Sequence, residues 1–413
     1  MKTRLPRLAA ALLLAAGLGP QALAADLTFW SWRQEDRAVY QEIIADFNKL
    51  HPDVKIKFEA FEPTSYNTIL STALAGGKGP DLIQTRAYGG IEAIAKPGYL
   101  LALDKTAVPE LDNFSADALA AETMREDGKV YAVPFATQTV LILYNKDIFK
   151  THGIQAPDTW DDLIAAAKAL KGKGVQPFAN GTATAWQNEI LMGAIAPSVY
   201  GPQFNGELVA GKATFEDKRF VDALTRMTEL KDYMPPGFTG VDYPTMQQLF
   251  ISGRAAMIAA GSFEIANFRR QNPKLDIGVM AGPAATKGGP RLVSLFVDGG
   301  YGINAKTEHK VDAIKFIRYA ATPRFGDLFA NKLGNVSPIK GVKIEDGLLA
   351  EVAKLNASSA PYVMLVNFRY NEPTGSALIQ AGVQKMMAGQ ATPAQVGADV
   401  TKGIAAYYKP FQR

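Results

Sequence analysis

A short polar segment at residues 136–139 separates two apolar runs and offers the first side chains suited to binding chemistry. The runs at 130–135 and 140–144 are short and rich in β-branched and aromatic residues, which is typical of strands. Because Pro134 cannot donate to a sheet ladder, we interpret them as one strand ending and another beginning in a neighbouring lobe. Gln138 would then offer hydrogen bonds to a small molecule held between two lobes. An ordinary hairpin inside one sheet is the alternative, and this segment alone does not decide between them.

Aromatic and charged residues also follow a predicted strand at 27–32. Trp32, Arg33 and Glu35 lie near the open end of that sheet, which is a usual place for a ligand. We expect only one of Trp30 and Trp32 to point inward, and we interpret Trp32 as the ligand contact. The alternative for Trp30 is a place in the core.

Arg86 and Tyr88 follow a third short strand and should lie at the mouth of the same sheet. An ordinary surface loop is the alternative for this pair. Asp81, at the start of that strand, is expected to cap or brace the following loop rather than to contact a ligand.

Enzymatic and metal chemistry have little support in this sequence. Glycosidases need paired carboxylates across one bond, and no single pair stands out. The only histidines are distant from one another: His51, His152 and His309. Because the chain also has no cysteine, these separated histidines argue against a zinc site.

The glycines at 76–79 lack the spacing of a phosphate-binding loop, and we interpret them as a helix stop. Tyr407 and Tyr408 would suit a ferric-ion binder, but adjacent residues do not share a helix face. We predict no enzyme activity, no cofactor and no bound metal.

The elements that must position these residues belong to an exported chain of 413 residues, a length that suggests two domains. Basic residues, a short apolar run and a small-x-small site occupy residues 1–24, which is the layout of a secretory signal cleaved after Ala24. Removal of that leader takes the formal charge from +4 to +1, so net charge gives no case for nucleic acid. We expect a periplasmic protein without disulfides, since the chain has no cysteine.

Strand and helix patterns alternate along the mature chain. Strands at 27–32, 54–58 and 81–86 alternate with helical patterns, which indicates a sheet covered by helices. A second pattern of this kind follows, beginning with a capping-box signal at Thr159 and Asp162. Residues 293–304 are interpreted as a return strand.

The chain resembles the extracellular solute-binding proteins of carbohydrate ABC importers, the group that includes maltose-binding protein. The resemblance covers essentially the whole mature chain, and it rests on seven weak motifs that occur in the family's order. The motifs are Thr28-Phe-Trp-Ser-Trp32, Phe47-Asn-Lys-Leu-His-Pro-Asp-Val54, Gly79-Pro-Asp-Leu-Ile83, Val133-Pro-Phe135 with Leu143-Tyr-Asn-Lys-Asp147, Pro157-Asp-Thr-Trp-Asp-Asp-Leu163, Gly253-Arg-Ala-Ala-Met257 and Tyr301-Gly-Ile-Asn304.

This resemblance implies a two-lobed α/β periplasmic-binding-protein fold of the type II kind, with crossing hinge strands and a ligand between the lobes. It places the first lobe at 25–136 plus 298–345 and the second at 137–297 plus 346–413. It also implies a monomer that captures a carbohydrate and delivers it to membrane permease subunits.

Ligand-binding positions are carried over on the matching motifs. Gln138 falls where maltose-binding protein has a carboxylate in the cleft, and Trp186 and Phe263 fall at aromatic sugar platforms. Arg369 and Tyr370 lie near a further aromatic position. Sugars present hydroxyls and apolar C–H faces, which amide and aromatic side chains can read.

Asp298 and Gly299 belong to the return strand and add two further candidates. The glycine allows a close backbone approach, and the carboxylate can accept from hydroxyls. A hinge turn is the alternative for this pair.

Two other functions stay open from the residues alone. Arg33 and Arg86 would suit an anionic solute, acidic or phosphorylated, in the same receptor role. A secreted carbohydrate-active enzyme is the alternative from another class.

Overall fold

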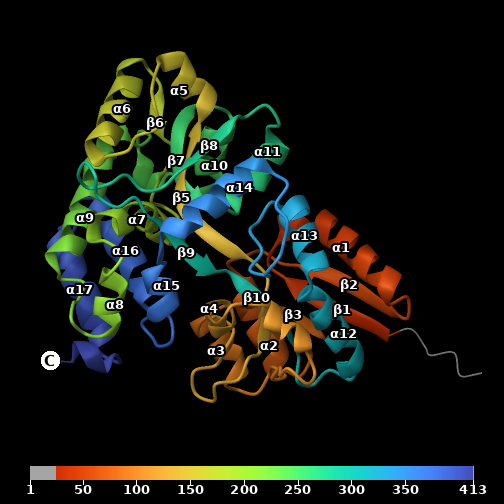
Figure 1. Ribbon diagram of the computed structural model, residues 1–413. Helices are drawn as coiled ribbons and strands as arrows, with labels where there is room; N and C mark the ends of the chain where they lie inside the picture. The colour runs from red at the N-terminus through yellow and green to blue at the C-terminus, as the bar shows by residue number, and fades with distance from the viewer. Residues whose placement is uncertain (1–24, 413) are drawn as a thin grey trace, which may run out of the picture.

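The computed structural model describes residues 25–412, so the leader predicted at 1–24 lies outside the described residues. Two sheets, each covered by helices, form two lobes that the chain connects by crossing strands (Figure 1). We call the elements around the five-stranded sheet the first lobe and those around the six-stranded sheet the second lobe. The two-lobed α/β architecture predicted from the sequence is confirmed.

The first-lobe sheet has the strand order β2-β1-β3-β10-β4. Its strands are β1 (Ala25–Ser31), β2 (Val54–Ala60), β3 (Leu82–Arg86), β4 (Ala132–Pro134) and β10 (Gly299–Ile303). β1 runs parallel to β2 and β3, whereas β10 is antiparallel to β3 and β4. Helices α1 (Arg37–Leu50), α2 (Tyr66–Ala75), α3 (Gly89–Ala95), α4 (Ala116–Ala120), α12 (Lys310–Ala320) and α13 (Pro323–Leu333) belong to this lobe.

The second-lobe sheet has the order β11-β9-β5-β7-β6, and β8 pairs with β5 as well. Its strands are β5 (Thr137–Asn145), β6 (Gln176–Phe178), β7 (Ala255–Gly261), β8 (Ile277–Met280), β9 (Val293–Val297) and β11 (Ser359–Pro361). Around them lie α5 (Lys146–His152), α6 (Trp160–Gly172), α7 (Ala185–Tyr200), α8 (Phe204–Val209), α9 (Lys218–Glu229), α10 (Tyr243–Ile251), α11 (Glu264–Gln271), α14 (Gly347–Leu355), α15 (Val363–Asn367), α16 (Gly375–Met387) and α17 (Pro393–Ala405). The chain thus begins in the first lobe and ends in the second.

Two pairs of strands carry the chain between the sheets: β4 continues into β5, and β9 continues into β10. The crossings are hydrogen-bonded to each other, since Phe135 N donates to Gly299 O and Asp298 N donates to Ala136 O, both at 3.0 Å. The segment between α13 and α14 makes a third connection between the lobes. It is hydrogen-bonded to the first crossing, since Thr137 N donates to Val336 O at 2.8 Å. The crossing predicted at 136–139 is therefore confirmed, and the hairpin alternative is wrong.

Residues 293–304 were expected to form one return strand, and this expectation is wrong. β9 pairs with β5 in the second lobe, whereas β10 pairs with β3 and β4 in the first. Asp298 lies at the break between them, so it occupies the hinge that the alternative interpretation assigned to it.

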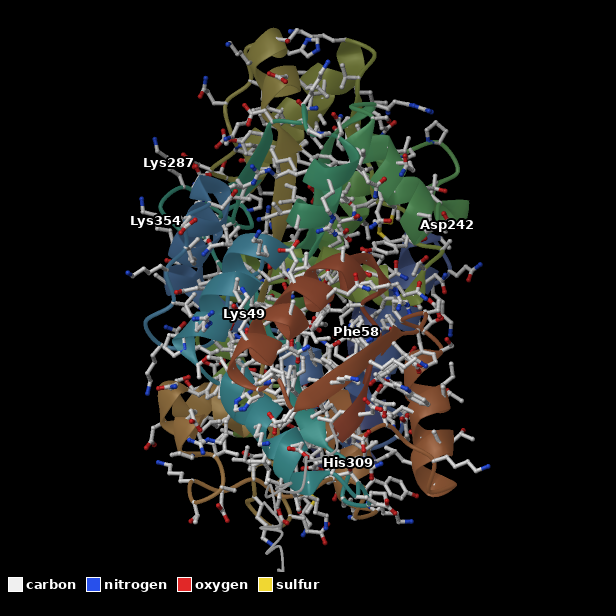
Figure 2. The ribbon with its side chains drawn as sticks, turned by 90° about the vertical axis from the view of Figure 1, so that its right-hand side faces the viewer. Lys49, Phe58, Asp242, Lys287, His309 and Lys354 are labelled. Atoms are coloured by element: carbon white, nitrogen blue, oxygen red, sulfur yellow. The ribbon has the colours of Figure 1, made fainter. Side chains whose placement is uncertain are left out.

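Aromatic rings fill the interior of the first lobe and hold its helices on the sheet. Tyr40 of α1 stacks on Phe58 of β2 with ring centroids 4.5 Å apart, and Phe29 of β1 meets Phe58 edge-on at 5.2 Å. Figure 2 shows α1 and β2 in the foreground of this lobe, with Lys49 labelled on the helix and Phe58 on the strand.

Within residues 25–412, no helix is both long and apolar enough to cross a membrane.

Candidate functional site

Gln138 lies at the crossing of the two lobes, and its side chain is completely buried. Its Nε2 donates to Asn335 Oδ1 at 3.0 Å and lies 3.5 Å from Asp298 Oδ2. Its Oε1 accepts from Ser262 Oγ at 2.8 Å. These partners come from the loops after β9, α13 and β7, so one amide joins three segments of the hinge. Its predicted contact with a ligand stays a prediction.

Arg33 forms a buried ionic network on the first-lobe side of this crossing. Its Nε donates to Asp36, and its Nη atoms lie 3.9 Å from a Glu35 oxygen and 3.7 Å from Asp298 Oδ2. Burial acts to lower the pKa of Arg33, but these carboxylates outweigh it and the pKa is raised. Arg270 of α11 lies 3.6 Å from Asp36 Oδ1, so the network also reaches the second lobe.

Arg86 lies at the end of β3 and covers one face of Trp32. Its guanidinium carbon is 3.7 Å from the centre of the indole, a cation–π contact. The indole itself packs against Tyr66 and Phe135 and is 4% exposed. Burial lowers the pKa of Arg86 to about 10, although Asp298, 3.8 Å away, acts to raise it.

The expectation that only one of Trp30 and Trp32 points inward was wrong. Trp32 follows the end of β1, and its indole packs against Tyr66 of α2. Trp30 is half-buried with its ring 4.7 Å from Phe61, which in turn lies near Tyr66, the neighbour of Trp32.

Tyr88 links the lobes through its hydroxyl, which accepts from Val297 N of β9 at 3.1 Å. Its φ of 58° is the one positive value at a non-glycine residue within residues 25–412. Such a conformation is costly and persists only where the surroundings enforce it, which is common at functional sites. The ring is buried, so the side chain of Tyr88 helps to hold the two lobes together.

The second lobe contributes an aromatic cluster at the N-terminal ends of three helices. Trp186 of α7 and Phe263, which precedes α11, are half-buried with ring centroids 6.3 Å apart. Tyr243 of α10 meets Trp186 edge-on at 4.7 Å. Partly exposed rings of this kind can stack on the C–H face of a sugar.

Glu264 follows this cluster, and the sequence analysis missed it. It is buried and accepts from Tyr243 Oη at 2.6 Å and from Gln247 Nε2 at 2.9 Å. Burial raises its pKa to about 7, while the two hydrogen bonds and the charge of Arg33 act against the rise. Arg270 of the same helix lies 3.6 Å from Asp36 Oδ1, so α11 faces the ionic network of the first lobe. The one available signal for Glu264 was its place directly after Phe263.

Arg369 and Tyr370 lie between α15 and α16, where the second lobe touches the first. The ring of Tyr370 lies 3.3 Å from the guanidinium carbon of Arg125, whose Nη2 donates to Val366 O at 3.3 Å. A side chain on Gly89 would lie 1.9 Å from the carbonyl oxygen of Arg369, so the two backbones are in close contact here. Neither Gly89 nor Arg125 was a predicted site residue, since only the folded chain brings them to this junction.

A continuous series of contacts connects the predicted residues of both lobes. Trp32 contacts Arg86, which faces Asp298, and Asp298 faces Gln138. Gln138 accepts from Ser262, whose neighbour Phe263 lies beside Trp186. Gly299 pairs with Arg86 between β10 and β3. The predicted residues therefore form one region between the lobes, and their contact with a ligand stays a prediction. Within residues 25–412, no three His, Cys, Asp or Glu side chains gather so as to hold a metal ion.

Two α/β lobes joined by paired crossing strands, with aromatic and hydrogen-bonding side chains between them, define a two-lobed solute-binding receptor. The chain belongs to the bacterial extracellular solute-binding protein family, whose model matches residues 30–326.

Individual relatives are similar over most of the chain. A multiple sugar-binding protein of Streptococcus mutans is 25% identical over 349 residues, which cover 82% of this chain and 81% of the relative. The sn-glycerol-3-phosphate-binding periplasmic protein UgpB of Pectobacterium atrosepticum is 28% identical over 370 residues, 81% of this chain and 78% of the relative. A solved structure described under xylan utilization by Caldanaerobius polysaccharolyticus has a TM-score of 0.79 and 26% identity, and the match covers 91% of this chain and 98% of that chain.

Proposed function

We propose that this protein is the periplasmic substrate-binding receptor of an ABC importer, which captures a sugar or oligosaccharide between its lobes and delivers it to the membrane permease. The observation that carries the proposal is the series of contacts from Trp32 through Gln138 to Trp186. It sets indole and phenyl rings beside amide, carboxylate and guanidinium groups at a junction between two lobes. The family and the sugar-binding relatives support it further.

The proposed receptor works by a hinge. Residues 25–136 plus 298–345 form the first lobe, and residues 137–297 plus 346–413 form the second. Residues 1–24 direct export and are removed. A ligand that contacts both lobes binds the closed state more tightly than the open one, and it therefore shifts the population toward closure. The protein acts as a monomer, without a cofactor and without catalysis.

Calorimetry and thermal unfolding with a panel of monosaccharides and oligosaccharides test this proposal. A bound sugar at 100 times its dissociation constant should stabilise the protein by about 2.7 kcal/mol. Chromatography of the bound oligosaccharide after long incubation should show no product. The proposal is overturned if the whole panel gives no response while a metal ion or a peptide gives a clear one.

A further inference from the structure

Arg86 has donors that the protein itself does not use. A guanidinium carries five N–H donors, yet the side chain of Arg86 makes no hydrogen bond to another residue in the described part of the chain. Its one ion-pair partner there is Asp298, at 3.8 Å, which is too long for a hydrogen bond. The side chain is 27% exposed, so solvent or a solute can reach part of it.

The one carboxylate that pairs with Arg86 is shared with another guanidinium group. Asp298 lies 3.8 Å from Arg86 and 3.7 Å from Arg33, which also pairs with Glu35 and Asp36. Glu122 is completely buried, accepts from Thr85 Oγ1 and leaves Oε1 without a partner among the described residues. Burial raises the pKa of Glu122 well above its usual value, and the charge of Asp298 adds to the rise.

A second cation approaches this point from the other lobe. Arg369 is exposed and, within residues 25–412, its side chain has neither an ion pair nor a hydrogen bond. Its backbone touches Gly89, three residues after Arg86. The positive charge of Arg369 adds to burial in lowering the pKa of Arg86. The carboxyl group of Glu189, which feels Arg369, is already hydrogen-bonded to Ser376 and Gln380.

We propose that the captured sugar carries an anionic group, a carboxylate or a phosphate, and that Arg86 and Arg369 bind it from opposite lobes. This inference rests on the proposed function and names the chemical class of its ligand. The planar fork of arginine matches both anions, and charge-assisted hydrogen bonds of this kind are about twice as strong as neutral ones. An anion between the two arginines would also remove their mutual repulsion as the lobes close.

Matched ligands that differ only in charge test the inference by calorimetry. One arm compares oligogalacturonides with their methyl esters, and the other compares glucose with glucuronate and glucose 6-phosphate. The acidic member should bind about tenfold more tightly or better, because hydrogen bonds to charged groups are worth more than neutral ones. Within the second arm, a tighter response to glucuronate indicates a carboxylate and a tighter response to glucose 6-phosphate indicates a phosphate. Inorganic phosphate alone should compete only at high concentration.

Variants assign the effect to the two arginines. Arg86→Gln and Arg369→Gln should each weaken the acidic ligand by about tenfold and the neutral one by less than about threefold. Arg86→Lys keeps the charge without the fork and should fall between. Arg254→Gln, an exposed arginine outside the site, is the matched control. Thermal unfolding without ligand shows whether each variant is folded.

The outcomes separate this inference from the proposed function. Neutral sugars that bind as tightly as acidic ones overturn the inference and leave the receptor function intact. If Arg86→Gln and Arg369→Gln lose equal affinity for the acidic and the neutral ligand, the inference is also overturned, since the arginines would then bind sugar hydroxyls. Absence of binding by every sugar, neutral and acidic, together with a clear response to a metal ion or a peptide, overturns both.

Discussion

Substitution of Gly89 by alanine should prevent the lobes from closing fully while each lobe stays folded. The added Cβ would lie 1.9 Å from the carbonyl oxygen of Arg369 and 2.4 Å from its carbonyl carbon, both backbone atoms. Ordinary contact begins at 3.4 Å, so the two surfaces must separate by about 1.5 Å, the difference between 3.4 and 1.9 Å. Gly89 is the first residue of α3, where alanine is favoured over glycine by up to about 1 kcal/mol.

The expected loss follows from the contacts that this separation breaks. Arg125 would lose its position over Tyr370 and its hydrogen bond to Val366 O, each worth about 0.5–1 kcal/mol. A deficit of about 1–2 kcal/mol corresponds to a five- to thirtyfold weaker ligand affinity. Calorimetry should record this loss, and small-angle scattering with saturating ligand should record a larger radius of gyration.

Gly347→Ala is the matched control, since Gly347 also begins a helix and a Cβ there meets no atom within 4 Å. It should leave both affinity and shape unchanged. The reasoning is refuted if Gly89→Ala binds ligand as tightly as the unaltered protein. A loss of thermal stability without ligand would also contradict it, because that would place the strain inside the first lobe.

Three further predictions concern the second lobe. Burial raises the pKa of Glu264 from 4.5 to about 7. Between these pH values the folded state keeps a proton that the unfolded state releases, so the free energy of unfolding should fall by up to about 3 kcal/mol as the pH rises from 4.5 to 7. Urea unfolding across this range should show a flatter profile for Glu264→Gln, and identical profiles would contradict the assignment. Trp186→Ala should weaken sugar binding by about tenfold in calorimetry, since a stacking surface worth roughly 1.5 kcal/mol is lost, with little change in unfolding. Thr159→Ala should cost about 1 kcal/mol in urea unfolding and leave binding unchanged, because its capping box with Asp162 lies at the start of α6.

Local patterns in the sequence predicted the elements well where a local cause decides the structure. The capping box at Thr159 and the strand end at Pro134 both follow from short-range chemistry, and both are present. Asp81 was expected to brace the loop that follows it, whereas its carboxylate accepts from Thr28 N of β1 at 2.8 Å and from the hydroxyl of Thr307. The residue does brace the fold, but its partners are distant in the sequence.

The site was less accessible to prediction, because its parts meet only in the folded chain. Arg125 reaches Tyr370 across 245 positions, and no local signal marks that pair. Asp298 and the two glycines after it interrupt the apolar run at 293–303, but no local signal shows that the two halves pair in different sheets. Gln138 was placed correctly at the crossing, yet its amide is already engaged by Asn335 and Ser262. A sequence does not distinguish polar side chains that stabilise a hinge from polar side chains that bind a ligand, because both have the same residue types.

The placement of the chain ends on different lobes has a practical consequence. β1 opens the first lobe, and α17 lies against α9 and α16 in the second (Figure 1). A rotation of one lobe against the other about the crossing strands should change the separation between β1 and α17. A donor fluorophore attached before β1 and an acceptor attached after α17 would therefore convert capture of a solute into an optical signal, with no alteration inside the receptor itself.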